Sequence, residues 1–278
     1  MGAVSTYPAR MERDMGEPRI ESLANPLVKS LRALRTPKGR DGQRQFLAEG
    51  AWMLDEAEAA GWHPEIILVD GSTVRGVAGA YAGRARRVIE TTREVLAKIT
   101  GRDNPQPLLA IFADPAPDAR DLTTLNAASS PRWLLLEAPR DPGNLGSCIR
   151  SADAVGAGGV IIAGDSCDPY AIETVRATMG SIFSVPIYRT TLDDACTLIR
   201  RWSGSTVAAT LQASDDYASM SYSAPSLLVV GSEAHGLSEE VVAACRSRVR
   251  IPMVGRAESL NLAVAAGLML YAAERAQR

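Results

Sequence analysis

Residues 251–265 read IPMVGRAESLNLAVA, and two earlier stretches read DPGNLGSCIR (141–150) and VVGSEAHGLS (229–238). Each stretch places a loop rich in Gly, Asn, Ser or charged residues between a short apolar run and a predicted helix. Short apolar runs that alternate with helices are typical of a parallel sheet covered on both faces. Polar loops after such strands meet at the carboxyl edge of the sheet, where α/β proteins bind ligands. The three stretches therefore predict an α/β fold with one site built from three loops.

The surrounding sequence continues this pattern. The predicted strands cover residues 133–136, 160–163, 206–210, 227–230 and 249–251, and the predicted helices cover roughly 144–155, 170–178, 192–202, 238–245 and 259–275. The glycines at 156, 158 and 159 precede a strand, whereas the glycines of a dinucleotide fingerprint follow one. Tight packing between a helix end and a strand explains them better. The chain has no P-loop, so a standard NAD or ATP enzyme is disfavoured.

A smaller α/β unit comes first. Asn25 and Pro26 predict a helix start, because Asn caps helices and Pro fits the first turn, and the run TPKG (36–39) ends this helix. Strands follow at 46–48, 66–69, 87–89 and 108–112, with helices near 51–60 and 92–99. We predict a disordered tail over residues 1–17, an N-terminal domain over 18–112, a linker over 113–131 and a C-terminal domain over 132–278.

Composition excludes few functions. The net charge is −2, but a basic cluster interrupted by the single acid Asp41 comprises Lys29, Arg32, Arg35, Lys38, Arg40 and Arg44. Such a cluster can bind phosphates whatever the global charge, and a solvated helix face explains it equally well. No apolar run is long enough to cross a bilayer. The four cysteines have no metal-ligand spacing, so we expect reduced thiols, no metal and a cytoplasmic protein.

The candidate site residues have ordinary explanations as well as functional ones. Asn144 lies at a helix start, where exposed N–H groups bind anions. Arg150 lies six residues later, which we take to place it on nearly the same helix face. Arg150 alternatively forms an ion pair with Asp153, and Glu233 alternatively caps a helix. Ser259 and Asn261 begin a long helix as ordinary caps do.

The two histidines have weaker claims. His235 follows Glu233 in its loop, and we treat it as a loop variant and not as a catalytic base. His63 precedes a proline in the N-terminal unit and is expected to be structural or exposed.

Taken together, the three stretches resemble the signature motifs of the SpoU (TrmH-type) RNA ribose 2′-O-methyltransferases, and residues 176–187 resemble the segment that connects them. The resemblance implies a SPOUT-type parallel sheet with a trefoil knot, although knots are rare in proteins. It also implies an L30e-like N-terminal domain that binds RNA, here through the basic cluster. The expected methyl donor is S-adenosylmethionine.

The resemblance also assigns residues and partners. Arg150 is the implied catalytic residue, with Asn144, Glu233, Ser259 and Asn261 positioning it and the ribose. The implied donor-binding residues are Thr210, Leu211, Gly231, Ile251, Met253 and Leu260. A homodimer is expected, and we expect it to stay folded without residues 1–112. The expected substrate is RNA, with 23S ribosomal RNA favoured. The alternatives are tRNA, a non-catalytic RNA-binding protein of the same fold, and a generic nucleotide-binding enzyme.

Overall fold

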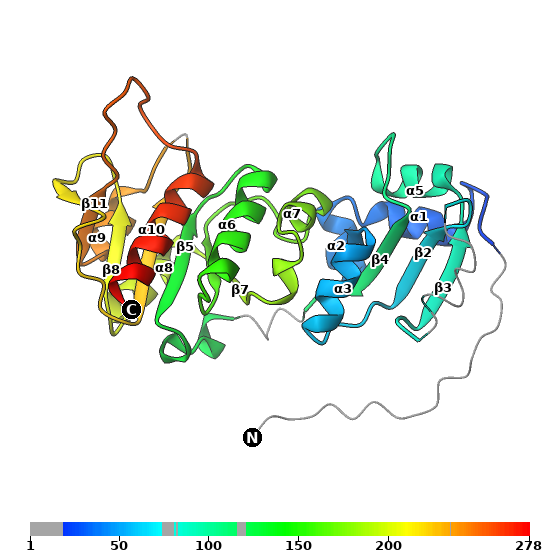
Figure 1. Ribbon diagram of the computed structural model, residues 1–278, viewed down its shortest axis with the longest axis horizontal. Helices are drawn as coiled ribbons and strands as arrows, with labels where there is room; N and C mark the ends of the chain where they lie inside the picture. The colour runs from blue at the N-terminus through cyan, green and yellow to red at the C-terminus, as the bar shows by residue number, and fades with distance from the viewer. Residues whose placement is uncertain (1–18, 74–80, 82, 116–120, 234) are drawn as a thin grey trace.

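The computed structural model describes residues 19–73, 81, 83–115, 121–233 and 235–278. Two sheets lie side by side along the longest axis of the molecule, with the N-terminal sheet on the right in Figure 1 and the C-terminal sheet on the left. The predicted disordered tail, residues 1–17, lies outside the described residues.

The N-terminal unit holds a four-stranded sheet in the order β1-β4-β2-β3. Strand β4 is antiparallel to β1 and β2, and β3 is parallel to β2. Its elements are α1 (Pro26–Ala33), α2 (Pro37–Gln43), β1 (Gln45–Glu49), α3 (Ala51–Ala59), β2 (Ile66–Asp70), β3 (Arg87–Thr91), α5 (Arg93–Thr100) and β4 (Leu108–Ala113).

Local signals explain the start of this unit. Asn25 caps α1 and accepts a hydrogen bond from Leu27 N at 2.8 Å. The expectation that residues 36–39 only end this helix was wrong, because α2 begins there. Thr36 is the cap of α2 and accepts a hydrogen bond from Gly39 N at 3.1 Å, and Pro37 occupies the first turn. The basic cluster therefore spans two helices and not one helix and a loop.

The C-terminal unit holds a seven-stranded sheet in the order β7-β6-β5-β10-β8-β11-β9, with parallel pairs throughout. Its elements are β5 (Arg132–Glu137), α6 (Pro142–Ala154), β6 (Val160–Ala163), α7 (Ile172–Ala177), η4 (Ser181–Phe183), β7 (Ile187–Thr190), α8 (Leu192–Arg201), β8 (Thr206–Ala209), β9 (Asp215–Asp216), β10 (Ser226–Gly231), α9 (Glu239–Ala244), β11 (Ser247–Arg250) and α10 (Leu262–Ala276).

Helices cover both faces of this sheet. Alternate residues of β5 belong to different core clusters: Leu134 and Leu136 pack with α6, α7 and α10, whereas Trp133 and Leu135 pack with α8 and α9. The expected burial on both faces is therefore present, and it explains why β5 reads as a continuous apolar run.

The strand order reverses between β5 and β10. The chain leaves β5 through α6 towards β6, and it leaves β10 through α9 towards β11 on the other side. The loops after β5 and β10 therefore diverge, and parallel sheets bind ligands in the crevice that results.

Several boundaries differ from the sequence-based expectation. Strands β7 and β9 were not predicted, and α10 begins at Leu262, later than residue 259, because Asn261 is its cap. Ser238 occupies the cap position of α9 but makes no side-chain capping hydrogen bond.

The two units share a core. Strand β4 ends at Ala113 and β5 begins at Arg132, with the short helices η2 (Leu122–Thr124) and η3 (Ala127–Ser129) between them. Phe46, Trp62 and Phe112 of the first unit pack on Phe183 of the second, with ring centroids 6.2, 5.5 and 4.8 Å apart. Deleting residues 1–112 would expose this aromatic surface to water, so the structure argues against the expected stable C-terminal fragment.

Candidate active site

Three polar side chains from distant parts of the chain meet where the strand order reverses. Asn144, in the first turn of α6, donates a hydrogen bond from Nδ2 to Oε1 of Glu233, which follows β10. Asn261 donates from Nδ2 to Oδ1 of Asn144 at 2.8 Å. Leu262 N donates to the same Glu233 oxygen at 3.3 Å. The structure thus joins one residue from each of the three sequence stretches in a single network.

The starts of two helices hold this network in place. Asp141 caps α6 and accepts a hydrogen bond from Asn144 N at 2.7 Å. Asn261 caps α10 and accepts from Ala263 N at 2.9 Å and Val264 N at 3.3 Å. Glu233 faces the first turn of α10, where the helix dipole favours a negative charge.

A cavity of about 310 Å³ adjoins the network at the carboxyl ends of β8, β10 and β11. Its lining includes all six residues that the resemblance assigns to donor binding: Thr210, Leu211, Gly231, Ile251, Met253 and Leu260. Glu233, Ser259 and His235 line the same cavity. Ser259 makes none of the hydrogen bonds that join Asn144, Glu233 and Asn261.

Gly231 shapes this cavity by permitting a close approach of the backbone. A Cβ atom at this position would lie 2.1 Å from the carbonyl carbon of Gly236 and 2.4 Å from the nitrogen of Leu237. A side chain would therefore push the loop after β10 away from the strand, and the loop could not keep its position on the cavity wall.

The lining suits S-adenosylmethionine. Leu211, Ile251 and Leu260 give apolar surface for a base. Glu233 supplies a negative charge that would favour the positively charged sulfur of this donor. The volume is at the lower end of the range for small-molecule sites.

Arg150 lies apart from the network. Its side chain is exposed, and among the described residues it makes no ion pair, with Asp153 or with any other acid. The expectation that it shares a helix face with Asn144 was wrong, because six residues turn a helix by about 600°, which leaves the two side chains roughly 120° apart. Arg150 is also absent from the lining of the cavity of its own chain.

Glu137 is a site residue that the sequence reasoning missed. It ends β5, is 7% exposed, and accepts a hydrogen bond from Ser238 N at 3.0 Å. It thereby holds the far end of the loop that carries Glu233. An acid directly after the apolar run 133–136 was the available signal.

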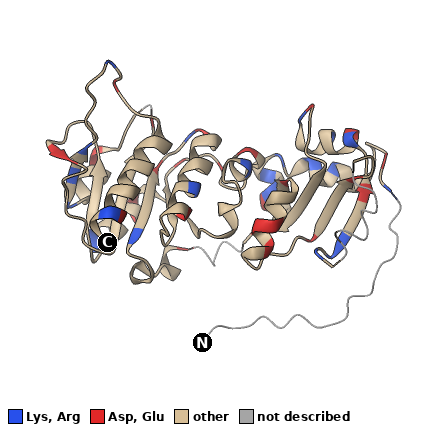
Figure 2. Cartoon of the chain, viewed as in Figure 1, with Lys and Arg blue, Asp and Glu red and all other residues tan. Residues whose placement is uncertain are grey.

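The basic cluster is divided by the fold. Lys29, Arg32, Arg35 and Lys38 are exposed on α1, on α2 and at the turn between them. Arg40 is 3% exposed, and its guanidinium binds Asp168 of the C-terminal unit at 2.7 Å. Its expected contact with RNA is therefore wrong, because the charge is buried and paired. Arg44 is partly exposed and lies 3.8 Å from Asp114. Charges of both signs lie on each half of the molecule (Figure 2).

The cysteines near the site are not activated. Burial raises the pKa of Cys167 to about 11 and also raises that of Cys148, with Glu233 adding to both shifts. Both thiols stay protonated at neutral pH and do not act as nucleophiles. Both histidines are exposed.

Among the described residues, no group of three or more His, Cys, Asp or Glu residues is placed to hold a metal ion. Within the same part of the chain, no helix has the length and apolar character needed to span a bilayer.

Comparison with known proteins identifies the family. The model of the SpoU rRNA Methylase family matches residues 131–271, and that of the MRM3-like substrate binding domain matches residues 25–110. The chain is 33% identical to a 23S rRNA (uridine(2479)-2′-O)-methyltransferase from Streptomyces viridochromogenes, over 96% of this chain and 95% of that protein. It is 28% identical to the 23S rRNA (guanosine(2553)-2′-O)-methyltransferase RlmP from Bacillus subtilis, over 91% of this chain and 98% of that protein.

A solved structure agrees. The AdoMet-bound rRNA methyltransferase from Sinorhizobium meliloti is 40% identical, with a TM-score of 0.83 over 93% of this chain and 97% of that chain. The chain therefore belongs to the SpoU rRNA methylase family of S-adenosylmethionine-dependent RNA ribose 2′-O-methyltransferases.

Proposed function

We propose that this protein transfers the methyl group of S-adenosylmethionine to a ribose 2′-hydroxyl of 23S ribosomal RNA. The observation that carries the proposal is the network of Asn144, Glu233 and Asn261, in which Glu233 also lines a cavity suited to the donor. The names of the Streptomyces and Bacillus relatives support 23S RNA as the substrate.

The residues divide the work between holding the donor and orienting the ribose. The donor supplies an electrophilic methyl group on a positively charged sulfur. The cavity residues hold it against the sheet edge, and in-line attack requires the hydroxyl to be fixed on the opposite side. The amides of Asn144 and Asn261, which Glu233 and the helix starts hold in place, are suited to that task. Ser259, at the cavity rim, adds a hydroxyl.

Arg150 is the proposed catalytic residue. A guanidinium is fully protonated at neutral pH and has no site to accept the hydroxyl proton, so Arg150 does not act as the base. Its planar fork suits a phosphate of the RNA beside the reacting ribose, and this contact would orient the hydroxyl.

We propose further that the protein is a homodimer in which Arg150 acts at the donor cavity of the partner subunit. On α10, Val264 and Tyr271 are 50% and 54% exposed, and Leu268 lies between them on the same side. An apolar stripe on a helix that already packs on α6 fits a second copy of the chain. Arg150 lies on α6, the helix on which α10 packs, so a dimer formed through this stripe would hold Arg150 close to the interface.

The exposed basic residues are the proposed RNA contacts. Among the described residues, no ion-pair partner is present for Lys29, Arg32, Arg35 or Lys38. Arg44 forms a long ion pair with Asp114, at 3.8 Å. Free surface cations clustered on α1, on α2 and at the turn between them can bind a phosphate backbone. The four free thiols fit a reducing, cytoplasmic setting.

The test is direct. The protein is incubated with labelled S-adenosylmethionine and either unmodified 23S RNA or unmodified tRNA, and the methylated ribose is mapped by mass spectrometry. We expect one methylated ribose in 23S RNA and none with the Arg150→Ala variant. Methylation of tRNA alone would replace the proposed substrate. Donor binding without transfer to either RNA would identify a non-catalytic RNA-binding protein.

A further inference from the structure

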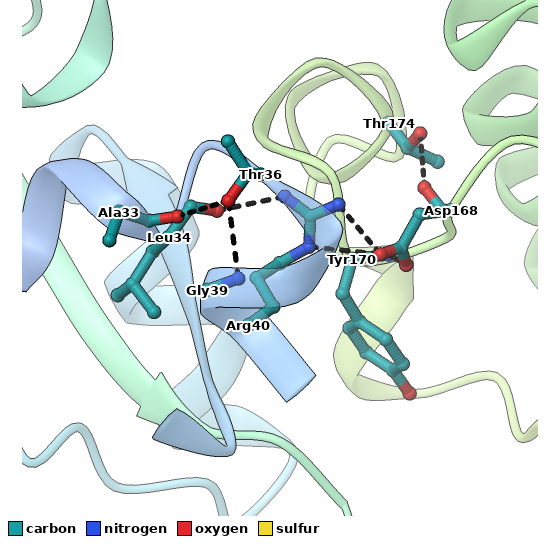
Figure 3. Close-up of polar contacts among 8 residues, drawn as sticks. All are labelled: Ala33, Leu34, Thr36, Gly39, Arg40, Asp168, Tyr170 and Thr174. Atoms are coloured by element: carbon teal, nitrogen blue, oxygen red, sulfur yellow. Dashed lines mark hydrogen bonds and ion pairs between the residues drawn. The ribbon is translucent and has the colours of Figure 1, made fainter. Parts of the chain in front are cut away.

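Helix α7 of the C-terminal unit is held at both ends by side chains of the N-terminal unit. Before the helix, Asp168 Oδ2 accepts from Nε and Nη2 of Arg40 at 2.9 and 2.7 Å (Figure 3). In its last turn, Arg176 binds Oε2 of Glu49, with Nε at 3.1 Å. Since α2 and β1 carry Arg40 and Glu49, each ion pair joins the two units.

Both pairs exclude water at one partner. The side chain of Arg40 is 4% exposed and that of Glu49 is 1% exposed. Arg40 also donates from Nη1 to the carbonyl of Leu34 at 2.8 Å, which fixes its guanidinium (Figure 3). Buried ion pairs contribute little net stability because desolvation offsets their attraction, but an unpaired buried charge is costly. The two ion pairs therefore strongly favour the one arrangement of the two units in which both pairs are formed.

The N-terminal unit supplies the cation of one ion pair and the anion of the other, and this determines how the two units are oriented. The N-terminal unit presents a cation at Arg40 and an anion at Glu49, and residues 168–176, which include most of α7, present Asp168 and Arg176 in the complementary order. Docking with α7 reversed would place like charges together at both ends, which is strongly disfavoured. One arrangement of the two units is thus selected.

An apolar contact between the two ion pairs and a hydrogen bond beyond them hold the same arrangement. Ile172, the first residue of α7, is 3% exposed and belongs to the core of the N-terminal unit, with Val28, Leu31 and Leu34. Trp62 Nε1 donates to the carbonyl of Phe183 at 2.9 Å. The α1–α2 face is therefore fixed relative to the sheet whose edge carries the donor cavity.

We propose that the Arg40–Asp168 and Glu49–Arg176 pairs are positioning elements that decide which ribose is methylated. They hold the basic face of α1 and α2 at one distance and orientation from the donor cavity, so that an RNA bound to that face presents a single ribose. This inference rests on the proposed function. It gives Arg40 a role between domains, although its sequence context suggests direct contact with RNA.

The test compares the double variant Arg40→Gln with Asp168→Asn against Lys38→Gln. The double variant removes both charges, keeps hydrogen-bonding groups, and leaves no buried charge unpaired, so it is expected to fold. Lys38→Gln is the matched control, because it removes an exposed charge from the same helix. Each protein is assayed for donor affinity, for kcat and KM with 23S RNA, for the salt dependence of RNA binding, and for amide hydrogen exchange.

We expect the double variant to bind the donor within twofold of wild type, to lose at least tenfold in kcat, and to methylate additional riboses. Amides of α7 and β1 should exchange at least tenfold faster, and the salt slope should not change. Lys38→Gln should raise KM and lower the salt slope by about one unit, without added products.

Three results would overturn the inference. Wild-type kcat with a single product in the double variant would show that the pair does not position the RNA. A salt slope that falls as in Lys38→Gln would make Arg40 an RNA contact. Unchanged amide hydrogen exchange in α7 and β1 of the double variant would show that the Arg40–Asp168 pair does not hold the two units together. If wild-type protein methylates no RNA, the proposed function fails, and the exchange data still decide whether the pair docks the units.

Discussion

Glu233 illustrates how single residues combine support and chemistry. Its carboxylate accepts hydrogen bonds from the amide of Asn144 and from the first turn of α10, so it is oriented before any ligand arrives. It is also the acid that lines the donor cavity. Loss of this charge should therefore weaken the binding of S-adenosylmethionine, whose sulfur is positively charged, more than the binding of S-adenosylhomocysteine, whose sulfur is neutral.

Glu233→Gln tests that difference. The amide keeps an acceptor oxygen, so the network and the fold should persist, but the negative charge is lost. We expect S-adenosylmethionine to bind roughly fivefold more weakly, about 1 kcal/mol at the effective dielectric of a partly open site. S-adenosylhomocysteine, which is neutral at sulfur, is the matched ligand and should bind nearly as before. Calorimetry with both ligands measures this, and equal weakening of the two would assign Glu233 a structural role only.

Arg150 makes the sharpest prediction at this scale. Its side chain is exposed and makes no ion pair within the described residues, so Arg150→Ala should leave thermal stability and donor affinity unchanged while abolishing methyl transfer. Arg150→Lys should not restore methyl transfer, because the point charge of lysine cannot replace the planar guanidinium of arginine. A variant that keeps more than about a tenth of the wild-type rate, a barrier change below roughly 1.4 kcal/mol, would contradict a catalytic role.

At the scale of elements, α10 links the stability of a helix to the geometry of the site. Asn261 uses Oδ1 to cap the helix and Nδ2 to hold Asn144. These two functions reside on different atoms of one side chain, so they can be separated by substitution.

Asn261→Ala and Asn261→Asp form the matched pair. Alanine removes the cap and should cost about 1 kcal/mol of unfolding free energy. Aspartate keeps the capping oxygen and should unfold near the wild-type temperature, but it cannot donate to Asn144. Both variants should lose kcat to a similar extent. Thermal unfolding and methylation assays measure the two effects, and an aspartate variant with full activity would show that the bond to Asn144 is dispensable.

The elements that the sequence did not predict were stabilised by distant contacts. Helix α2 contains Gly39 and Gly42 in seven residues, which gives it low intrinsic helix propensity. It forms nevertheless with the Thr36 cap at its start and with Arg40 bound to Asp168, 128 residues away. Strand β7 reads IYRT, and its Arg and Thr interrupt the apolar run by which the other strands were recognised. Apolar runs such as β5 and β10 were predicted because burial on both faces leaves a local signal.

The same limit applies to the site. The sequence placed Asn144, Glu233 and Asn261 after strands of one parallel sheet, and shared edges bring such residues together. It could not separate Arg40 from its exposed neighbours, because charge in a sequence carries no information about burial. It also could not reveal Glu137, whose role depends on the loop that returns to meet it.

For the whole molecule, the remaining question is which chain completes each site. The cavity and its network belong to one chain, whereas Arg150 neither lines the cavity nor joins the network of Asn144, Glu233 and Asn261. A dimer formed through the α10 stripe of Val264, Leu268 and Tyr271 would combine the cavity of one chain with Arg150 of the other. Activity would then depend on association, although donor binding would not.

Mixing two inactive variants tests this arrangement. One chain carries Arg150→Ala and the other carries Glu233→Ala, and differently tagged copies are co-expressed so that mixed dimers can be purified. If Arg150 acts on the partner's cavity, each mixed dimer has one site with both defects and one intact site, so about half of the wild-type activity per dimer should return. If Arg150 acts within its own chain, every site carries one defect and no activity returns. Introducing Leu268→Arg into both chains is the control, because it should prevent association and abolish the recovery while each chain keeps its fold.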